Sequence, residues 1–277
     1  MPRTPRKKKS SSAALAEASE LSSLDPLRPG MPALDSILSV RTLQTSEAMA
    51  VAESMNVSGY RIIRTNEVDA YEKAATSTET LNAALAAAEA APVGDSFKGT
   101  ARKAAKLSLA SAATKTFTDL KTLINSLPAH EDMAKLKIKT TATSDRVAEE
   151  KRNIKVKVFL YAASREDDND YHLILGRSLA SSPEVYMTME LSGLPPASKP
   201  AFAKLKAARD AFKSFFGGDL PGLSYDFYDP PIPVQIEGSL FWDASHSKGS
   251  RPGPKSLKSR MPVVWEVHPI SKITFNP

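Results

Sequence analysis

Ile154-Lys-Val-Lys-Val-Phe-Leu-Tyr161 alternates apolar and polar residues and then becomes continuously apolar. This pattern is typical of a β-strand that passes from the edge of a sheet into its core. A polar turn follows at residues 165–169, and two further strand-like runs occupy residues 171–175 and 184–191. The stretch therefore predicts three consecutive strands, and it decides the fold of the C-terminal part of the chain.

A helix and two more strands follow these three strands along the chain. The helix is expected between a cap at Ser198 and a stop at Gly217, and the strands at residues 234–241 and 263–267. Three strands, one helix and two strands is the element order of a five-stranded Greek-key barrel of the OB type. We therefore expect an OB-like β-barrel domain over residues 151–277.

The N-terminal half has a different composition. Residues 1–24 are basic and then rich in Ser and Ala, which predicts a disordered basic arm. Residues 25–150 are expected to be mostly helical with short strands, because residues 74–127 are rich in the strong helix former Ala. Pro92 breaks this stretch, and its second part, residues 97–127, carries an apolar stripe at helical spacing. The predicted fold class is thus α+β, with a mainly helical N-terminal region followed by the barrel.

Two shorter strands and a helix are expected earlier in the chain. Residues 37–43 and 60–65 are rich in β-branched residues and predict strands, and residues 46–55 predict a helix that begins at Ser46. These elements complete the organisation expected for the N-terminal half.

Composition excludes several classes of protein. The chain has 277 residues, no cysteine, 42% hydrophobic residues and 25% charged residues. Disulfides, thiolate metal sites and a cysteine nucleophile are therefore excluded. There is no apolar run of transmembrane length and no secretory signal, so a soluble cytoplasmic protein is the expectation. The net charge of +6 is concentrated in residues 1–9 and 98–157, whereas residues 158–277 contain equal numbers of acidic and basic residues.

Three short motifs in the C-terminal part resemble those of a known group of proteins. They are Asp170-Tyr-His-Leu, Phe241-Trp-Asp-x-x-His246 and Trp265-Glu-x-His268-Pro. The chain resembles here a widespread group of uncharacterised bacterial proteins with Asp-x-His-Leu, Phe-Phe-Asp-x-x-His and Glu-x-His-Pro motifs. The resemblance covers residues 153–275 and implies the OB-like fold, but no established activity.

The same motifs contain candidate metal ligands. Residues two apart on a strand share a face, so two of the motifs each place a carboxylate beside a histidine, and the third pair lies at the exit of a strand. If the pairs converge, they offer mixed nitrogen and oxygen ligands to a metal ion that activates water. The alternative, which the sequence favours, is that each histidine bonds a neighbouring carboxylate and fixes a strand end. The candidate ligands are Asp170, His172, Asp243, His246, Glu266 and His268.

A second candidate site is basic. The loop at residues 248–260 has five basic residues and no acidic residue, and it lies between the last two strands, where OB-type barrels often bind oligonucleotides. If the N-terminal arm binds nucleic acid, its basic side chains hold the phosphate backbone through charge alone. The candidate nucleic-acid-binding residues are Lys248, Arg251, Lys255, Lys258 and Arg260 in the loop and Lys7, Lys8 and Lys9 in the arm.

The leading functional hypothesis is a non-enzymatic binding protein whose ligand is a nucleic acid or an acidic protein, with no cofactor. One rival is a metal-dependent hydrolase that uses the three C-terminal histidines. Another is a protein–protein interaction module whose helical half docks a partner or self-associates. The sequence leaves the oligomeric state open, and it contains no phosphate loop, nucleophile elbow or dinucleotide fingerprint.

Overall fold

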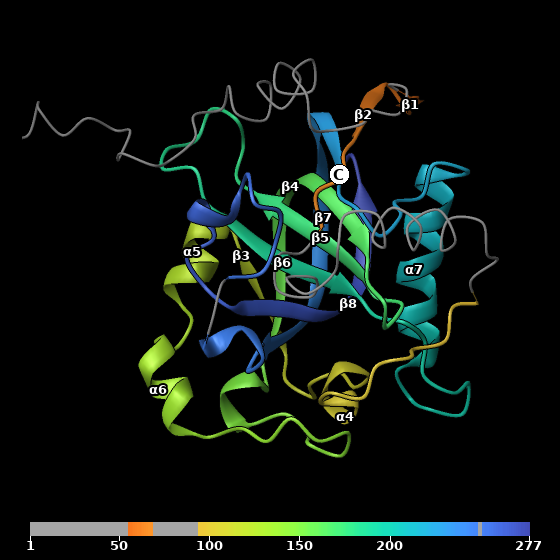
Figure 1. Ribbon diagram of the computed structural model, residues 1–277. Helices are drawn as coiled ribbons and strands as arrows, with labels where there is room; N and C mark the ends of the chain where they lie inside the picture. Colours follow the sequence, from red (N-terminus) through yellow and green to blue (C-terminus); the bar gives the residue numbers. More distant parts are fainter. Residues whose placement is uncertain (1–54, 69–93, 249–250) are drawn as a thin grey trace, which may run out of the picture.

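A computed structural model describes residues 55–68, 94–248 and 251–277 of the chain (Figure 1). Several expectations fall outside these residues. They are the basic arm at residues 1–24, the strand at 37–43, the helix at 46–55 apart from its last residue, and the first part of the Ala-rich stretch. Those expectations stay predictions.

Strands dominate the described part of the chain. They are β1 (Met55–Val57), β2 (Tyr60–Arg64), β3 (Thr114–Phe117), β4 (Asn153–Arg165), β5 (Tyr171–Gly176), β6 (Tyr186–Leu191), β7 (Asp226–Trp242) and β8 (Trp265–Phe275). The α-helices are α4 (Lys103–Lys106), α5 (Leu120–Asn125), α6 (His130–Lys135) and α7 (Phe202–Phe216). Three 3₁₀ turns complete the set: η1 (Ala148–Glu150), η2 (His246–Lys248) and η3 (Lys258–Arg260).

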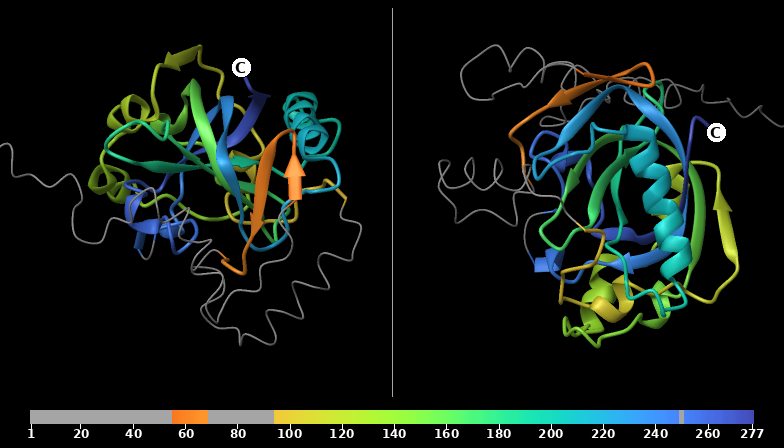
Figure 2. Two further views of the ribbon diagram at one scale, coloured as in Figure 1. Left: turned by 90° about the horizontal axis from the view of Figure 1, so that it is seen from above. Right: turned by 90° about the vertical axis from the view of Figure 1, so that its right-hand side faces the viewer.

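The eight described strands form one mixed sheet in the order β1-β2-β7-β8-β6-β5-β4-β3. Strand β7 pairs with β4 as well, so β4, β5, β6, β8 and β7 close into a ring. Strands β3 and β4 are parallel, as are β6 and β8, and the other pairs are antiparallel. Figure 2 shows this strongly curved sheet with α7 lying along its outside.

The predicted fold class is wrong. The sheet has eight strands rather than five, because three strands from the N-terminal half join it: β2 pairs with β7, β1 pairs with β2, and β3 pairs with β4. The described part of the N-terminal half is also not mainly helical, since its three α-helices contain only four to six residues each. Described strands on both sides of the expected domain boundary near residue 150 therefore belong to one sheet.

The long helix expected at residues 97–127 does not exist. This segment contains α4, then β3, then α5. The run Thr114-Lys-Thr-Phe117 has two β-branched residues, and it pairs in parallel with residues 153–156 of β4. Backbone pairing with an existing strand outweighs a helix preference of a few tenths of a kcal/mol per residue.

The strands expected at 60–65 and beyond residue 153 are confirmed, with β7 and β8 longer than predicted. The expected helix is present and ends at Gly217, but it begins at Phe202 without a side-chain cap, so the cap predicted at Ser198 is wrong. Helix α7 buries Leu205, Phe212 and Phe216, and it packs against β8. The ring of Phe215 stacks on Phe275 at 3.9 Å. None of the helices in the described residues is long and apolar enough to cross a membrane.

Candidate metal centre

Strand register brings acidic and histidine side chains from three strands together. His172 on β5 is the cross-strand partner of Glu190 on β6. Met189 is the partner of Val267 on the parallel strand β8, so the next residues, Glu190 and His268, lie side by side. Glu266 lies two residues before His268 and shares its face. One strand face therefore collects two histidines and two carboxylates.

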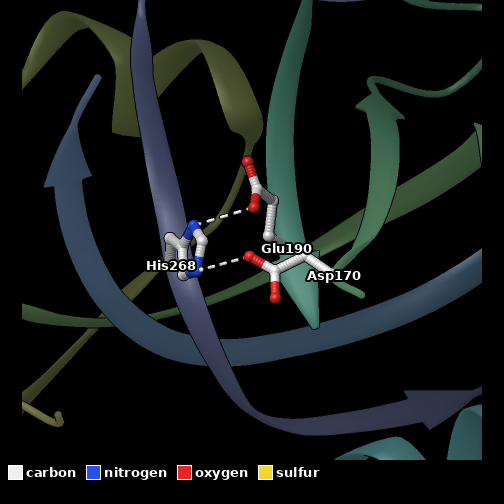
Figure 3. Close-up of side chains that lie close together, drawn as sticks. All are labelled: Asp170, Glu190 and His268. Carbon is white, nitrogen blue, oxygen red and sulfur yellow. Dashed lines mark ion pairs between the residues drawn. The ribbon is translucent and has the colours of Figure 1, made fainter. Parts of the chain in front are cut away.

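His268 lies between three carboxylates. Its Nδ1 atom is 2.9 Å from Oε2 of Glu190 and 3.6 Å from Oε2 of Glu266, and its Nε2 atom is 3.3 Å from Oδ2 of Asp170. Figure 3 shows the imidazole of His268 held between Glu190 and Asp170. Both His268 and Asp170 are completely buried. The imidazole thus fixes the orientation of the acids on either side of it.

His172 is oriented in a similar way. Its Nδ1 atom lies 3.2 Å from Oε1 of Glu166 and 3.0 Å from the hydroxyl of Tyr225. Its Nε2 atom lies 3.9 Å from Oε1 of Glu190. When Nδ1 donates its proton to Glu166, Nε2 carries the lone pair and faces the carboxylates.

Two sets of three side chains have the spacing of metal ligands. The donor atoms of His172, Glu190 and Glu266 lie within 4.8 Å of one another, and so do those of Asp170, Glu190 and His268. Bonds of about 2.0–2.2 Å between a metal ion and its donor atoms place two donor atoms on opposite sides of the ion at most about 4.4 Å apart. Small side-chain shifts would therefore bring the three donor atoms of either set to bonding distance from one shared ion.

A cavity of about 460 Å³ opens over the first of these sets. His172, Glu190 and Glu266 line it, whereas Asp170 and His268 do not and lie behind it. The first set therefore has access to a ligand and to water, and the second set is an internal support. The cavity is also lined by Ala101, Arg102, Lys106, Glu166, Asp167, Asp168, Phe241, Asp243, Ala244, Ser245 and His246.

Asp243 and His246 form a separate pair at the wall of this cavity. The Oδ2 atom of Asp243 bonds the Nδ1 atom of His246, and its Oδ1 atom accepts a hydrogen bond of 2.8 Å from the backbone N–H of Ser245. The side chains of both are 13% exposed. This aspartate–histidine pair has the arrangement of a general base oriented by a carboxylate.

Lys106 supplies the nearby positive charge. Its Nζ atom lies 3.2 Å from Oδ2 of Asp168 and 3.7 Å from Oδ2 of Asp170. Burial alone would lower the pKa of this ammonium, but the charges of the surrounding carboxylates, Glu190 first, raise it well above its usual value. Arg102, which also lines the cavity, is neutralised by a two-bond ion pair with Glu150 at 2.6 and 2.7 Å.

The buried acids divide into ionised and protonated groups. Burial opposes ionisation of Glu190, but the charges of His268 and Lys106 outweigh it and hold the pKa of Glu190 well below its usual value. Burial, with the charge of Glu190 added, raises the pKa of Glu266 to about 8. Burial raises the pKa of Asp170 to about 6.

Neighbouring carboxylates also determine the pKa of His268, because their effect is opposite to that of burial and larger. Burial opposes the imidazolium, but the charge of Glu190 and the close contacts with Asp170 and Glu266 raise the pKa of His268 well above its usual value. The pKa of Asp243 is lowered, since the hydrogen bond from His246 outweighs its burial. The cluster thus contains more carboxylates than resident cations, and some of them hold protons for that reason.

The six candidate metal ligands predicted from the sequence lie in or behind the wall of one cavity, and they have three different environments there. His172 and Glu266 face the cavity, Asp170 and His268 lie behind it, and Asp243 and His246 form their own pair. The prediction missed three contributors, Glu190, Lys106 and Glu166. The signal for Glu190 was an acid within the apolar alternation of Met187-Thr-Met-Glu-Leu191, whereas α4 gives no such signal for Lys106.

The predicted nucleic-acid-binding residues that the structure describes differ in exposure. Arg260 is 2% exposed, pairs with Glu184 and lies over the ring of Tyr186, so its guanidinium is held inside the protein. Arg251 and Lys255 are exposed and Lys258 is half-buried. The side chain of Lys248 and residues 7–9 lie outside the described part of the chain.

Comparisons with protein-family models, with curated proteins and with solved structures find no match to this chain. The resemblance of the three motifs to a group of bacterial proteins therefore stays a prediction. Function has to be argued from the site itself.

Proposed function

We propose that this protein is a metal-dependent hydrolase that holds one divalent ion with His172, Glu190 and Glu266. The observation that carries the proposal is the convergence of these three donors within 4.8 Å of one another at the wall of a 460 Å³ cavity. One imidazole and two carboxylates suit Zn²⁺ or Mn²⁺, which accept mixed nitrogen and oxygen ligands.

The residues behind the ligands support the same proposal. Metal-bound histidines usually donate their other ring N–H to a carboxylate, and Nδ1 of His172 lies 3.2 Å from Oε1 of Glu166, within reach of such a bond. Ligating carboxylates are in turn held by hydrogen bonds, and His268 lies 2.9 Å from Glu190 and 3.6 Å from Glu266. This second layer of contacts is the kind that fixes a metal site in place.

The charge balance favours a cation in the cavity. Glu266 holds a proton near neutral pH because the charge of Glu190 and burial raise its pKa to about 8. A divalent ion placed between the two carboxylates removes that repulsion. A bound ion would activate water for attack on an ester or amide, and the Asp243–His246 pair, which lines the same cavity, would take the proton of that water.

Metal binding tests the proposal. Protein stripped with a chelator is titrated with Zn²⁺ and with Mn²⁺ in a calorimeter, and the metal content after desalting is measured by elemental analysis. We expect one ion per chain, and loss of binding in Glu190→Gln. Glu237→Gln on β7 is the matched control, because that side chain is part of a surface pair with Lys155 and lies away from the cavity. Absence of binding in the unaltered protein would refute the proposal.

The hydrolytic part needs its own measurement. Metal-loaded protein is assayed with p-nitrophenyl acetate, p-nitrophenyl phosphate and bis(p-nitrophenyl) phosphate. Hydrolysis that depends on added metal and is lost in both Glu190→Gln and His246→Gln supports the assignment. Nucleic-acid binding, the leading hypothesis from the sequence, stays a prediction, and a filter-binding titration at low salt tests it.

A further inference from the structure

A second cavity lies on the other side of α4 from the metal centre. It is a groove of about 800 Å³ whose wall is made by α4 and the segment after it, by residues 142–143, and by residues 195–204 at the start of α7. Its lining is largely apolar, with Leu107, Leu109, Pro195 and Ala201 among the contributors. Pro195 and Ala201 are buried, and the two leucines are half-buried.

The charged side chains of the groove are all of one sign. Lys103, Lys199 and Lys204 line it and are exposed, and none of the described residues in the lining is acidic. No ion pair joins these three lysines to an acid elsewhere in the described part of the chain. Nearby lysines differ in this respect, since Lys206 pairs with Asp210 and Lys213 pairs with Asp95.

The start of α7 adds to the positive potential. Helix α7 has 15 residues, its first turn contains no acid, and no side chain caps its N-terminus. The positive end of the helix dipole is therefore not balanced by a local carboxylate, and Lys199 and Lys204 flank it. The groove thus combines an apolar floor with an unbalanced positive rim.

We propose that this groove binds a linear amphipathic anion, a medium-chain acyl carboxylate, independently of the metal centre. The acyl chain lies along Leu107, Leu109 and Pro195, and the carboxylate faces Lys199 and Lys204. The apolar wall removes the chain from water, which is the main source of affinity. The lysines select the sign of the head group, because an ammonium head in the same position is repelled.

The probes are octanoate, decanoate and dodecanoate, each below its micellar concentration, titrated into the full chain in a calorimeter. We expect the affinity to rise by up to about fourfold for each added methylene group. The site is located by amide chemical shifts in ¹H–¹⁵N spectra, with the largest changes expected at Leu107, Ser108 and Ala201. Dodecyltrimethylammonium, which has the same chain length and a positive head, is expected to bind at least tenfold more weakly.

Exposed variants separate the head-group contribution from folding. Lys199→Glu combined with Lys204→Glu reverses two surface charges, and we expect it to weaken dodecanoate binding at least tenfold. Lys121→Glu on α5, an exposed lysine away from the groove, is the control and should leave binding unchanged. Equal affinity for the anionic and cationic probes, unchanged affinity in the double variant, or shift changes outside the groove would each overturn the proposal.

Discussion

The Nδ1 atom of His268 on β8 lies 2.9 Å from Oε2 of Glu190 on the parallel neighbour β6. The other ring nitrogen of His268 lies 3.3 Å from Asp170, so one buried imidazole joins two acids that are 20 residues apart in the chain. Strand pairing at Met189 and Val267 produces this contact. The carboxylate of Glu190 is thereby presented to the cavity in a fixed orientation.

Replacement of this imidazole tests its supporting role. We expect His268→Gln to lower the affinity for Zn²⁺ or Mn²⁺ by about 10- to 100-fold, because the variant loses the imidazole contact that fixes the orientation of Glu190. Titration calorimetry of the chelator-treated protein measures the change, and circular dichroism checks the fold. His246→Gln is the control, since His246 pairs with Asp243 and is not among the proposed ligands. Equal loss of metal in both variants would show that the ligand set is wrong.

Lys106 is expected to compete with the metal ion. Its ammonium lies 3.2 Å from Asp168 and 3.7 Å from Asp170, and the charge of Glu190 holds it there. A divalent ion in the cavity is repelled by this ammonium, because Lys106 lines the same cavity as the proposed ligands. We therefore expect Lys106→Met, which keeps the chain length, to raise the metal affinity about tenfold or more.

The control for this variant is Lys103→Met, an exposed lysine on the same helix. It should leave the metal affinity unchanged. A fall in affinity in Lys106→Met would mean that the ammonium orients the ligands rather than competing with the ion.

The C-terminal strands were predictable because their patterns are local. The alternation in Ile154-Lys-Val-Lys-Val and the stop of α7 at Gly217 depend on residues next to one another in the chain. The cap expected at Ser198 is wrong, because α7 begins at Phe202 and no side chain caps it. The membership of β3 in the sheet depends on parallel pairing with β4, which no local pattern shows. The Ala-rich sequence around β3 favours a helix, and tertiary pairing overrides that preference.

The candidate site was predictable in composition but not in arrangement. The period of two placed Asp170 beside His172 and Glu266 beside His268. The sequence does not show which strands are neighbours, so it missed Glu190, which reaches His172 through β5–β6 pairing and His268 through β6–β8 pairing. It also could not show that the loop residue Arg260 turns inward to Glu184.

The ion pair of Arg102 and Glu150 should be important for stability. Arg102 donates two hydrogen bonds to Glu150, and both side chains are almost completely buried. Glu150 also accepts from the backbone N–H groups of Trp242 and Val147. We expect Glu150→Gln to lower the free energy of unfolding by about 3–5 kcal/mol, since it leaves a buried guanidinium without its counter-charge.

Urea unfolding followed by circular dichroism measures this loss. Glu149→Gln, next to it in the chain and less buried, is the matched control and should change the free energy by about 0.5 kcal/mol or less. A loss below about 1 kcal/mol in Glu150→Gln would indicate that water or another acid compensates Arg102.

Asp95 joins the segment before α4 to helix α7, and its contribution should depend on pH. Its Oδ1 atom accepts from Nε of Arg209 at 3.2 Å, and its Oδ2 atom accepts from Nζ of Lys213 at 3.0 Å. Burial opposes ionisation, but the hydrogen bonds from Lys213 and Arg209 outweigh it and lower the pKa of Asp95 below its usual value of 3.8. A carboxylate whose pKa is lowered by folding stabilises the folded state above its unfolded pKa, and this contribution is lost as the pH falls through the folded pKa.

We therefore expect Asp95→Asn to lower the free energy of unfolding by about 1–2 kcal/mol at neutral pH. The difference from the unaltered protein should begin to shrink as the pH falls below 3.8, where the unfolded chain takes up a proton at Asp95. It should vanish only below the lowered folded pKa, where the acid is protonated in both states. Urea unfolding between neutral pH and about pH 3 measures the free energy of unfolding of the variant and of the unaltered protein as a function of pH. Asp210→Asn removes an exposed pair with Lys206 and should leave the free energy of unfolding unchanged at any pH. If the difference in free energy of unfolding between the two proteins stayed constant down to low pH, the effect of Asp95 would come from packing and not from its charge.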